Sequence, residues 1–87
     1  MDLINIEKAI ETNLYHIHPK SNAPLHTHEG RDQIYYCIKG SGFGILENQE
    51  IELNVGDSFI VPAGTLHTLR SDGDLYVADL LVPQVDD

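Results

Sequence analysis

The sequence predicts a single all-β domain, spanning residues 1–87, folded as a small antiparallel barrel. The chain has 87 residues, which is enough for one domain and no more. Turn-forming residues recur at short intervals, and the segments between them are short and rich in strand-forming residues. Only Asn5–Glu11 has a pattern that fits a short helix, which leaves too little helix for an α/β fold. A closed antiparallel barrel is the simplest remaining architecture, because closure removes exposed sheet edges.

The turn signals divide the chain into a series of expected strands. These strands are Leu14–His18, Gln33–Lys39, Phe43–Glu47, Glu50–Leu53, Ser58–Val61, Leu66–Arg70 and Leu75–Val82. The polar residues between Phe43–Glu47 and Glu50–Leu53 predict a hairpin, and Gly40–Gly42 predicts a turn before it. The dipeptide Asp72-Gly73 predicts a second hairpin, between the last two strands.

Composition excludes several classes of partner. The chain has 14 acidic and 5 basic residues, for a formal charge of −9, and no Lys/Arg cluster, so nucleic acids and anionic membranes are not expected partners. No apolar run resembles an export signal or reaches the ~18 residues of a spanning helix, and the one cysteine, Cys37, cannot form an internal disulfide. We therefore expect a cytoplasmic protein. A domain this small often gains stability from a metal or a partner chain.

Three histidines indicate a metal site. His26 and His28 are two residues apart, so on a strand both side chains point to the same face. His67 opens a later expected strand, directly after the turn at Pro62–Gly64. A His-x-His pair alone is a weak signal, but three imidazoles favour a divalent transition metal such as nickel, manganese, iron, zinc or copper.

The spacing of these histidines resembles the two conserved motifs of the cupin family. The first motif runs G-x5-H-x-H-x3,4-E-x6-G, and here it is His26-Thr27-His28, then Gln33, then Gly40. The second runs G-x5-P-x-G-x2-H-x3-N, and here it is Gly56, Pro62-Ala63-Gly64, His67 and Ser71. The resemblance implies a small single-domain cupin of the RmlC-like type, with the double-stranded β-helix or jelly-roll barrel of that family.

Three positions depart from the motifs. Lys20 stands where the first motif begins with glycine, so Pro19 and Asn22 are expected to make that turn, and Ser71 replaces the closing asparagine. The usual metal-binding glutamate is also absent. Asp32 and Gln33 compete for its place, because the motif allows either gap, and the spacing to Gly40 favours Gln33. The resemblance therefore implies metal ligands His26, His28, Gln33 and His67.

A glutamine ligand changes the expected chemistry. Three imidazoles and an amide leave the metal charge of +2 uncompensated, which strengthens it as a Lewis acid and favours anionic, oxygen-rich ligands. A set of three histidines and one glutamine resembles the centre of small cupins that ketonise unsaturated uronates, and of some dioxygenase-like cupins. The resemblance implies a metal-dependent isomerase, lyase or dioxygenase acting on a small metabolite such as an unsaturated uronate or an enolisable sugar acid. The alternative is a non-catalytic module that binds a metal or a sugar.

Other residues have weaker indications. Strand alternation places Tyr35 and Cys37 on the same inner face as Gln33, where Tyr35 is either a catalytic proton donor or core filling. Cys37 is expected to be a small apolar core residue. A second metal site at His16 and His18 is less expected than packing or solvation.

Two features of the outer surface complete the predictions. The side chains of Ile34, Tyr36 and Ile38 form an outward apolar stripe that predicts a homodimer, unless another segment of the chain covers it. Arg70 has the opposite parity to His67 and is expected at the surface.

Overall fold

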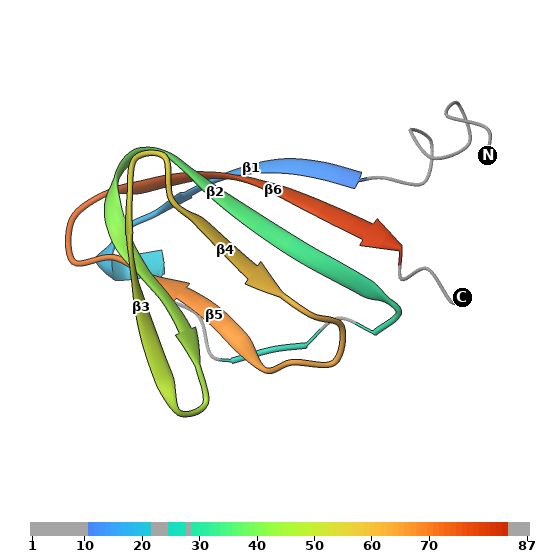
Figure 1. The fold of residues 1–87 in the computed structure, drawn as a ribbon. Coiled ribbons are helices and arrows are strands. Elements are labelled where there is room, and N and C mark those ends of the chain that lie inside the picture. The colour runs from blue at the N-terminus through green and yellow to red at the C-terminus, as the bar shows by residue number, and fades with distance from the viewer. Residues whose placement is uncertain (1–10, 22–24, 28, 84–87) are drawn as a thin grey trace.

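The computed structural model describes residues 11–21, 25–27 and 29–83. Within these ranges the chain forms only antiparallel strands and one short 3-10 helix. In chain order the elements are β1 (Glu11–Ile17), η1 (Pro19–Ser21), β2 (Arg31–Leu46), β3 (Gln49–Asn54), β4 (Ser58–Val61), β5 (His67–Arg70) and β6 (Leu75–Pro83) (Figure 1). The predicted all-β antiparallel fold is confirmed.

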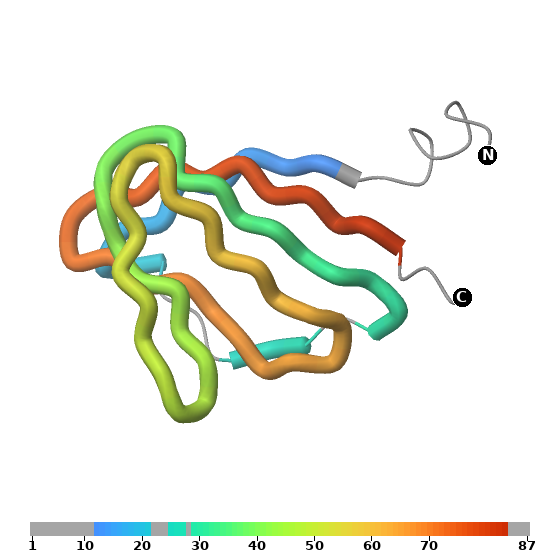
Figure 2. Tube along the Cα trace, viewed as in Figure 1, coloured from blue at the N-terminus to red at the C-terminus, as the bar shows by residue number. Residues whose placement is uncertain are grey.

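Strand β2 belongs to two sheets. Its N-terminal half pairs with β4 on one side and with β6 on the other, and β1 adds beyond β6. Its C-terminal half pairs with β3 and β5. A two-residue bridge between His26 and His67 extends the second sheet beyond β5. Figure 2 shows β2 running along the first sheet, bending, and returning beside β3. The two sheets are therefore joined at this bend.

The predicted turn at Gly40–Gly42 is wrong, because β2 continues through it as one strand of 16 residues. The register shifts between Cys37 and Lys39, and Gly40 has a φ of 77°. A Cβ atom at Gly40 would lie 2.0 Å from the backbone oxygen of Asp74, and one at Gly42 would lie 2.5 Å from that of Arg70. These glycines bend the strand under a neighbouring backbone instead of reversing it.

The predicted hairpin at Asp72-Gly73 is also wrong. Strand β5 pairs with the C-terminal half of β2, whereas β6 pairs with the N-terminal half and with β1. The connection therefore crosses from one sheet to the other. Ser71 secures the crossing: its hydroxyl donates to the carbonyl oxygen of Ser41 at 2.8 Å and accepts from the N–H of Gly73 at 3.2 Å. The hairpin between β2 and β3 was predicted correctly, with Leu46 paired to Gln49.

The core lies between the two sheets. Strand β2 buries Gln33, Tyr35 and Cys37 and turns the intervening side chains outward, as the alternation predicted. The apolar core comprises Ile17, Tyr35, Cys37, Leu53, Phe59, Val61, Leu69, Leu75 and Val77. Arg70 lies outside it, as expected, where it pairs with Glu50 at 3.2 Å and covers the ring of Phe43.

The N-terminal region differs from the sequence prediction. Glu11, expected to end a short helix, begins β1, and residues 5–10 of that expectation lie outside the described residues. The turn at Lys20 is made by η1, in which the backbone N–H of Ser21 donates to the carbonyl oxygen of His18 at 2.9 Å. Asn22, expected to share in this turn, lies outside the described residues. In the described part of the chain, no helix is long and apolar enough to cross a membrane.

Substituting Gly44→Ala is expected to destabilise the fold by about 1–3 kcal/mol, through overpacking of the core. A Cβ atom at Gly44 would lie 2.5 Å from the ring of Phe59, a buried residue that cannot easily move. Urea denaturation measures the change in the free energy of unfolding. The matched control is Gly73→Ala, which meets no atom within 4 Å and should change it by less than ~0.5 kcal/mol. Equal effects of the two substitutions would contradict the packing described for β2.

Candidate metal centre

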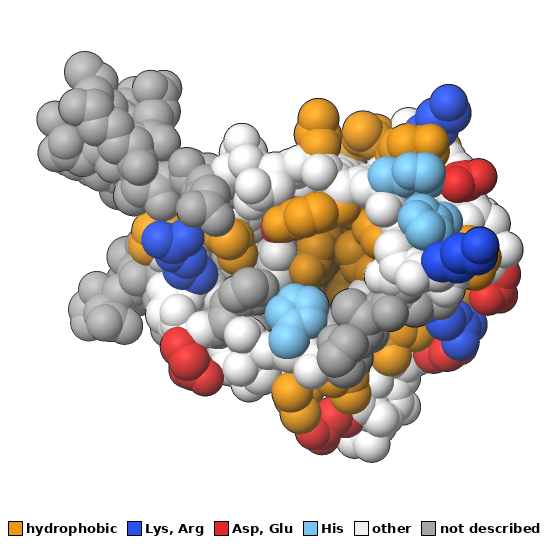
Figure 3. All heavy atoms as spheres, turned by 180° about the vertical axis from the view of Figure 1, so that it is seen from behind, with side chains coloured by type: hydrophobic (Ala, Val, Ile, Leu, Met, Phe, Trp, Pro, Cys, Tyr) orange, Lys and Arg blue, Asp and Glu red, His pale blue; other side chains and the backbone are white. Residues whose placement is uncertain are grey.

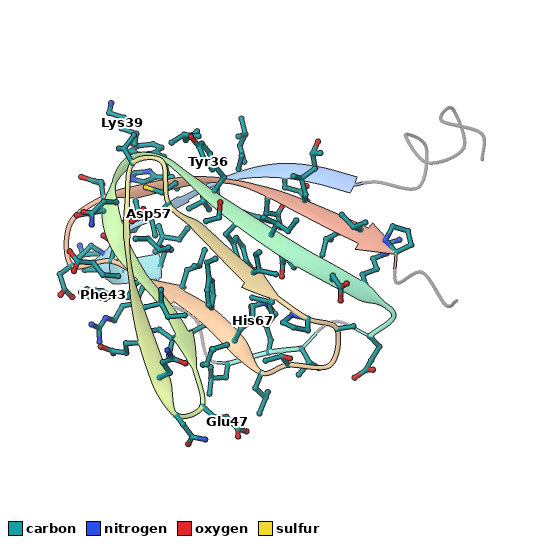
Figure 4. All side chains as sticks on the ribbon, viewed as in Figure 1. Tyr36, Lys39, Phe43, Glu47, Asp57 and His67 are labelled. Atoms are coloured by element: carbon teal, nitrogen blue, oxygen red, sulfur yellow. The ribbon has the colours of Figure 1, made fainter. Side chains whose placement is uncertain are left out.

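His67 is the first residue of β5 and is buried, with 1% of its surface exposed. Figure 4 shows it pointing into the space between the sheets. The turn before it is closed by the N–H of Thr65, which donates to the carbonyl oxygen of Pro62 at 3.2 Å, with Gly64 at a φ of 79°. The carbonyl oxygen of Thr65 lies 2.8 Å from Nδ1 of His67. A carbonyl can only accept, so Nδ1 carries the proton and Nε2 faces the interior.

Asp32, which competed with Gln33 in the sequence, supports this turn from outside. Its Oδ1 accepts a hydrogen bond from the backbone N–H of Ala63 at 2.9 Å. Asp32 therefore fixes the loop that presents the Thr65 carbonyl. Alternation along β2 separates it from Gln33.

Gln33 brings an amide to the buried nitrogen of His67. It is 3% exposed, and its Oε1 lies 2.8 Å from Nε2 of His67. Its Nε2 donates to a carboxylate oxygen of Asp79. This hydrogen bond sets the amide orientation and leaves Oε1 toward His67.

His26 stands beside His67 on the opposite side of the bridge. The two residues exchange backbone N–H···O bonds, each 2.9 Å long, and their ring centroids lie 4.4 Å apart. The structure thus brings together three of the four predicted ligands, from both sheets: His26, Gln33 and His67. The fourth, His28, lies outside the described residues.

Asp79 is a functional candidate that sequence reasoning missed. It is 1% exposed on β6, paired with Tyr35 of β2 in the sheet register. One signal in the sequence could have found it: the buried positions of β6 alternate, and Asp79 follows Leu75 and Val77 in that series. A carboxylate at an inward position of an apolar strand is unusual, because burial of a charge needs compensation.

A cavity of about 450 Å³ opens beside these side chains. It is lined by Tyr15, His16, Ile17, Ser21, His26, Gln33, Tyr35, Thr68, Leu69 and Leu81. Figure 3 shows a hollow floored by hydrophobic side chains, with histidine at its edge. The space is mostly apolar, with polar groups at one end, as in small-molecule sites.

Tyr35 contributes a protonated hydroxyl to this cavity. Burial raises the pKa of Tyr35, the negative charge of Asp79 and the side chain of Tyr15 raise it further, and a hydrogen bond with Gln33 opposes the shift. At neutral pH the hydroxyl therefore stays neutral and can donate. Cys37 behaves as expected: it is fully buried, and burial raises the pKa of its thiol.

His16 and His18 pack at the surface instead of forming a second centre. Nε2 of His16 lies 2.7 Å from Oδ1 of Asp74, and its ring stacks on that of Tyr76 at 4.2 Å. His18 meets His16 edge to face. Among the described residues, no three His, Cys, Asp or Glu side chains are grouped so as to hold a metal. The candidate centre therefore depends on Gln33 and on His28.

Residues 13–82 match the family model described as the cupin domain. This is most of the chain and includes every residue of the candidate centre, so the protein belongs to the cupin family.

Three curated relatives share part of this sequence. The chain is 43% identical over 59 residues to quercetin 2,3-dioxygenase of Bacillus subtilis, covering 67% of this chain and 18% of that protein. It is 30% identical over 64 residues to an oxalate-binding protein of Thermotoga maritima, covering 74% of this chain and 53% of that protein. An uncharacterised protein of Methanocaldococcus jannaschii is 30% identical over 73 residues, covering 82% of this chain and 58% of that protein. The chain thus spans less than two thirds of each relative's length.

Solved structures confirm the fold. A protein described as a predicted oxalate decarboxylase of Thermotoga maritima has a TM-score of 0.79 and 21% identity, covering 97% of this chain and 76% of that one. The DMSP lyase of Ruegeria pomeroyi has a TM-score of 0.78 and 20% identity, covering 91% of this chain and 41% of that one. At these identities the likeness concerns the barrel alone.

The raised pKa of Tyr35 predicts a loss of stability in alkali. Below the pKa of tyrosine in the unfolded chain, about 10, both states are protonated. Above it the unfolded state loses its proton first, which favours unfolding by up to roughly 1.4 kcal/mol per pH unit. We expect Tyr35→Phe to reduce this loss, as measured by urea denaturation between pH 9 and pH 11. The control is Tyr36→Phe, the same change at an exposed tyrosine. Both variants retain Cys37, so a Tyr35→Phe profile parallel to the wild type would contradict the assignment.

Proposed function

We propose that the protein binds one divalent transition metal through His26, His28, Gln33 and His67. The observation that carries this proposal is the close approach of two atoms that can both act as metal ligands. Nε2 of His67 and Oε1 of Gln33 lie 2.8 Å apart, while the other polar atom of each side chain is committed to Thr65 or to Asp79. Two lone pairs repel at this distance unless a proton or a cation lies against both.

The donor set fits a metal ion. Ligand atoms bonded to one ion at about 2.0–2.2 Å, at a right angle, lie roughly 3 Å from each other, close to the 2.8 Å between these two atoms. The contact from His67 Nδ1 to the Thr65 carbonyl is the kind of second hydrogen bond that orients metal-binding histidines. Imidazole and amide donors suit nickel, manganese, iron, zinc or copper.

We further propose that the cavity receives a small, anionic, oxygen-rich metabolite. A bound metal would supply Lewis-acid or redox chemistry at the polar end of the cavity. The chain has a formal charge of −9, so an anion needs local positive charge to enter. One relative named as an oxalate-binding protein and one named as a quercetin dioxygenase support an oxygen-rich ligand. A cavity of about 450 Å³ suits one sugar ring or a smaller acid.

The residues that line the cavity have different roles toward a bound ligand. Ile17, Leu69 and Leu81 form apolar walls of the cavity. Tyr35 keeps its proton at neutral pH and lines the cavity, so it is placed to donate a hydrogen bond or a proton to a bound oxygen. An isomerase, a lyase and a dioxygenase could each use this arrangement.

The alternative function is a non-catalytic binding module, and a relative named as an oxalate-binding protein favours it. The two functions differ in turnover. An enzyme loaded with nickel, iron or manganese in turn should transform at least one of a panel of uronates, β-dicarbonyls and vicinal diols. Tight ligand binding by the metal-loaded protein without any turnover would assign the binding module.

We also propose that two copies of the chain associate through the outer face of the first sheet. The predicted stripe of Ile34, Tyr36 and Ile38 lies on this face, with Tyr36 and Ile38 44% and 45% exposed. Ile60 and Leu14, at 64% and 75%, continue it across the neighbouring strands. Such a face offers on the order of 500 Å² per copy, which reaches the lower range of specific interfaces when doubled.

The metal site predicts a loss of binding in His26→Ala, with the fold retained because His26 is exposed. Elemental analysis of the tag-free protein should find about one metal ion per wild-type chain and much less in the variant. His16→Ala, which removes a histidine outside the proposed ligand set, is the control and should retain the metal. If reconstituted wild type holds no metal, or holds as much as His26→Ala, the proposed centre is wrong.

The association predicts a concentration-dependent mass. Analytical ultracentrifugation should find dimers at micromolar concentrations for the wild type and monomers for Ile60→Glu, because the new charge would be buried at the interface. Val55→Glu, at an equally exposed residue of the turn that follows β3, should leave the dimer intact because Val55 is not one of the residues named for this face. A wild type that stays monomeric throughout would refute the association.

A further inference from the structure

Asp79 is a carboxylate in the buried interior of the barrel. Its side chain is 1% exposed in the middle of β6, between Asn13 of β1 and Tyr35 of β2 in the sheet register. One oxygen accepts from the amide of Gln33. The other, Oδ1, is buried and has no hydrogen-bond partner among the residues that the structure describes. An apolar residue would fill this position without the cost of burying a charge.

The position of Asp79 relates it to the proposed metal centre. Asp79, Gln33 and His67 form a row: the carboxylate accepts from the Gln33 amide nitrogen, and the Gln33 oxygen lies 2.8 Å from His67. Without an acceptor at Asp79 the amide could turn over and present its N–H groups to His67. An N–H group in that place cannot bind a cation. The orientation of Gln33 as an oxygen ligand therefore depends on Asp79.

The charge of an ionised Asp79 is a second reason to relate this residue to the metal centre. The cupin motif usually has glutamate where this chain has Gln33, so the ligand set itself is neutral. Asp79 returns one negative charge to the site, one side chain further from the metal. The hydrogen bond from Gln33 to Asp79 also polarises the amide and makes Oε1 of Gln33 a stronger ligand for a cation.

We propose, on the basis of the proposed function, that Asp79 is a positioning residue for the metal. It orients Gln33 and supplies the negative charge that a glutamate ligand would otherwise carry. Gln33 on β2 supplies the ligand oxygen and Asp79 on β6 supplies the charge, so the two side chains together replace the carboxylate of a glutamate ligand. The metal is then more positive than with a glutamate ligand, because the negative charge lies one side chain further away. The site as a whole is closer to neutral than it would be without Asp79.

A cycle of substitutions tests this inference. The affinities of the purified, metal-free proteins for Zn²⁺ and Ni²⁺ are measured by competition with a chelating dye. Asp79→Asn should lower both affinities about 10–100-fold. It removes the negative charge, and asparagine, which can donate as well as accept, no longer fixes the orientation of the Gln33 amide. Gln33→Glu alone places two carboxylates in contact, and its metal-free form should melt at a lower temperature than the wild type. The double variant Gln33→Glu/Asp79→Asn moves the charge onto the ligand and should restore the affinity to within a few-fold of the wild type or above it.

Two controls separate positioning from structure. Asp74→Asn removes the same charge at an exposed carboxylate that pairs with His16, and it should leave the affinities unchanged. The melting temperature of each metal-free protein reports any structural role. If Asp79→Asn does not fold, the double variant keeps one carboxylate and one amide in contact and still tests the proposal.

The outcomes distinguish this inference from the function it rests on. Wild type that binds neither metal overturns both. Wild type that binds, with Asp79→Asn binding equally well, overturns the role of Asp79 and leaves the metal centre standing. The double variant should bind metal better than Asp79→Asn. If Asp79→Asn does not fold, the comparison is with His26→Ala instead. Failure of this comparison overturns the proposal that Gln33 and Asp79 together replace a glutamate ligand.

Discussion

The continuity of β2 is the constraint on which the rest of the structure depends. One strand of 16 residues pairs with β4 and β6 in its first half and with β3 and β5 in its second. The bend requires glycine at positions 40 and 42, because neighbouring backbone atoms leave no room for a Cβ. It folds the second sheet over the first. Gln33 of the first sheet can then meet His67 of the second, and the core and the site share one interior.

Neighbouring groups orient the residues of the candidate centre. Asp32 fixes the backbone of Ala63, and the carbonyl of Thr65 in the same loop fixes the ring of His67. Asp79 fixes the amide of Gln33 from the opposite side. Together these contacts set the orientation of Gln33 and His67. Orientation by such outer contacts is typical of sites that must hold an ion in a set geometry.

The sequence was most informative where local patterns decide structure. Alternation along β2 correctly predicted that Gln33, Tyr35 and Cys37 face inward, because period-two burial is a property of the strand itself. It failed at Gly40–Gly42 and at Asp72-Gly73, where glycine was interpreted as a turn signal. In the first case the reason is a close approach to a backbone distant in sequence, and in the second it is a crossing between sheets. Asp79 was missed for a related reason, since its partner Gln33 lies 46 residues away. The spacing of the histidines carried family information, but how His28 completes the site stays a prediction.

The same long separations have a kinetic consequence. The Gln33–His67 contact spans 34 residues and the Gln33–Asp79 contact spans 46, and no local segment of the chain contains more than one of these residues. Loops of this length must close before the contacts form, so the centre cannot exist in a partly folded chain that lacks β5 or β6. Any ion that binds there binds only the completed barrel, and its binding energy then opposes unfolding of the whole domain. For a domain with so small a core, metal supply would therefore govern how long the folded state survives as well as its chemistry.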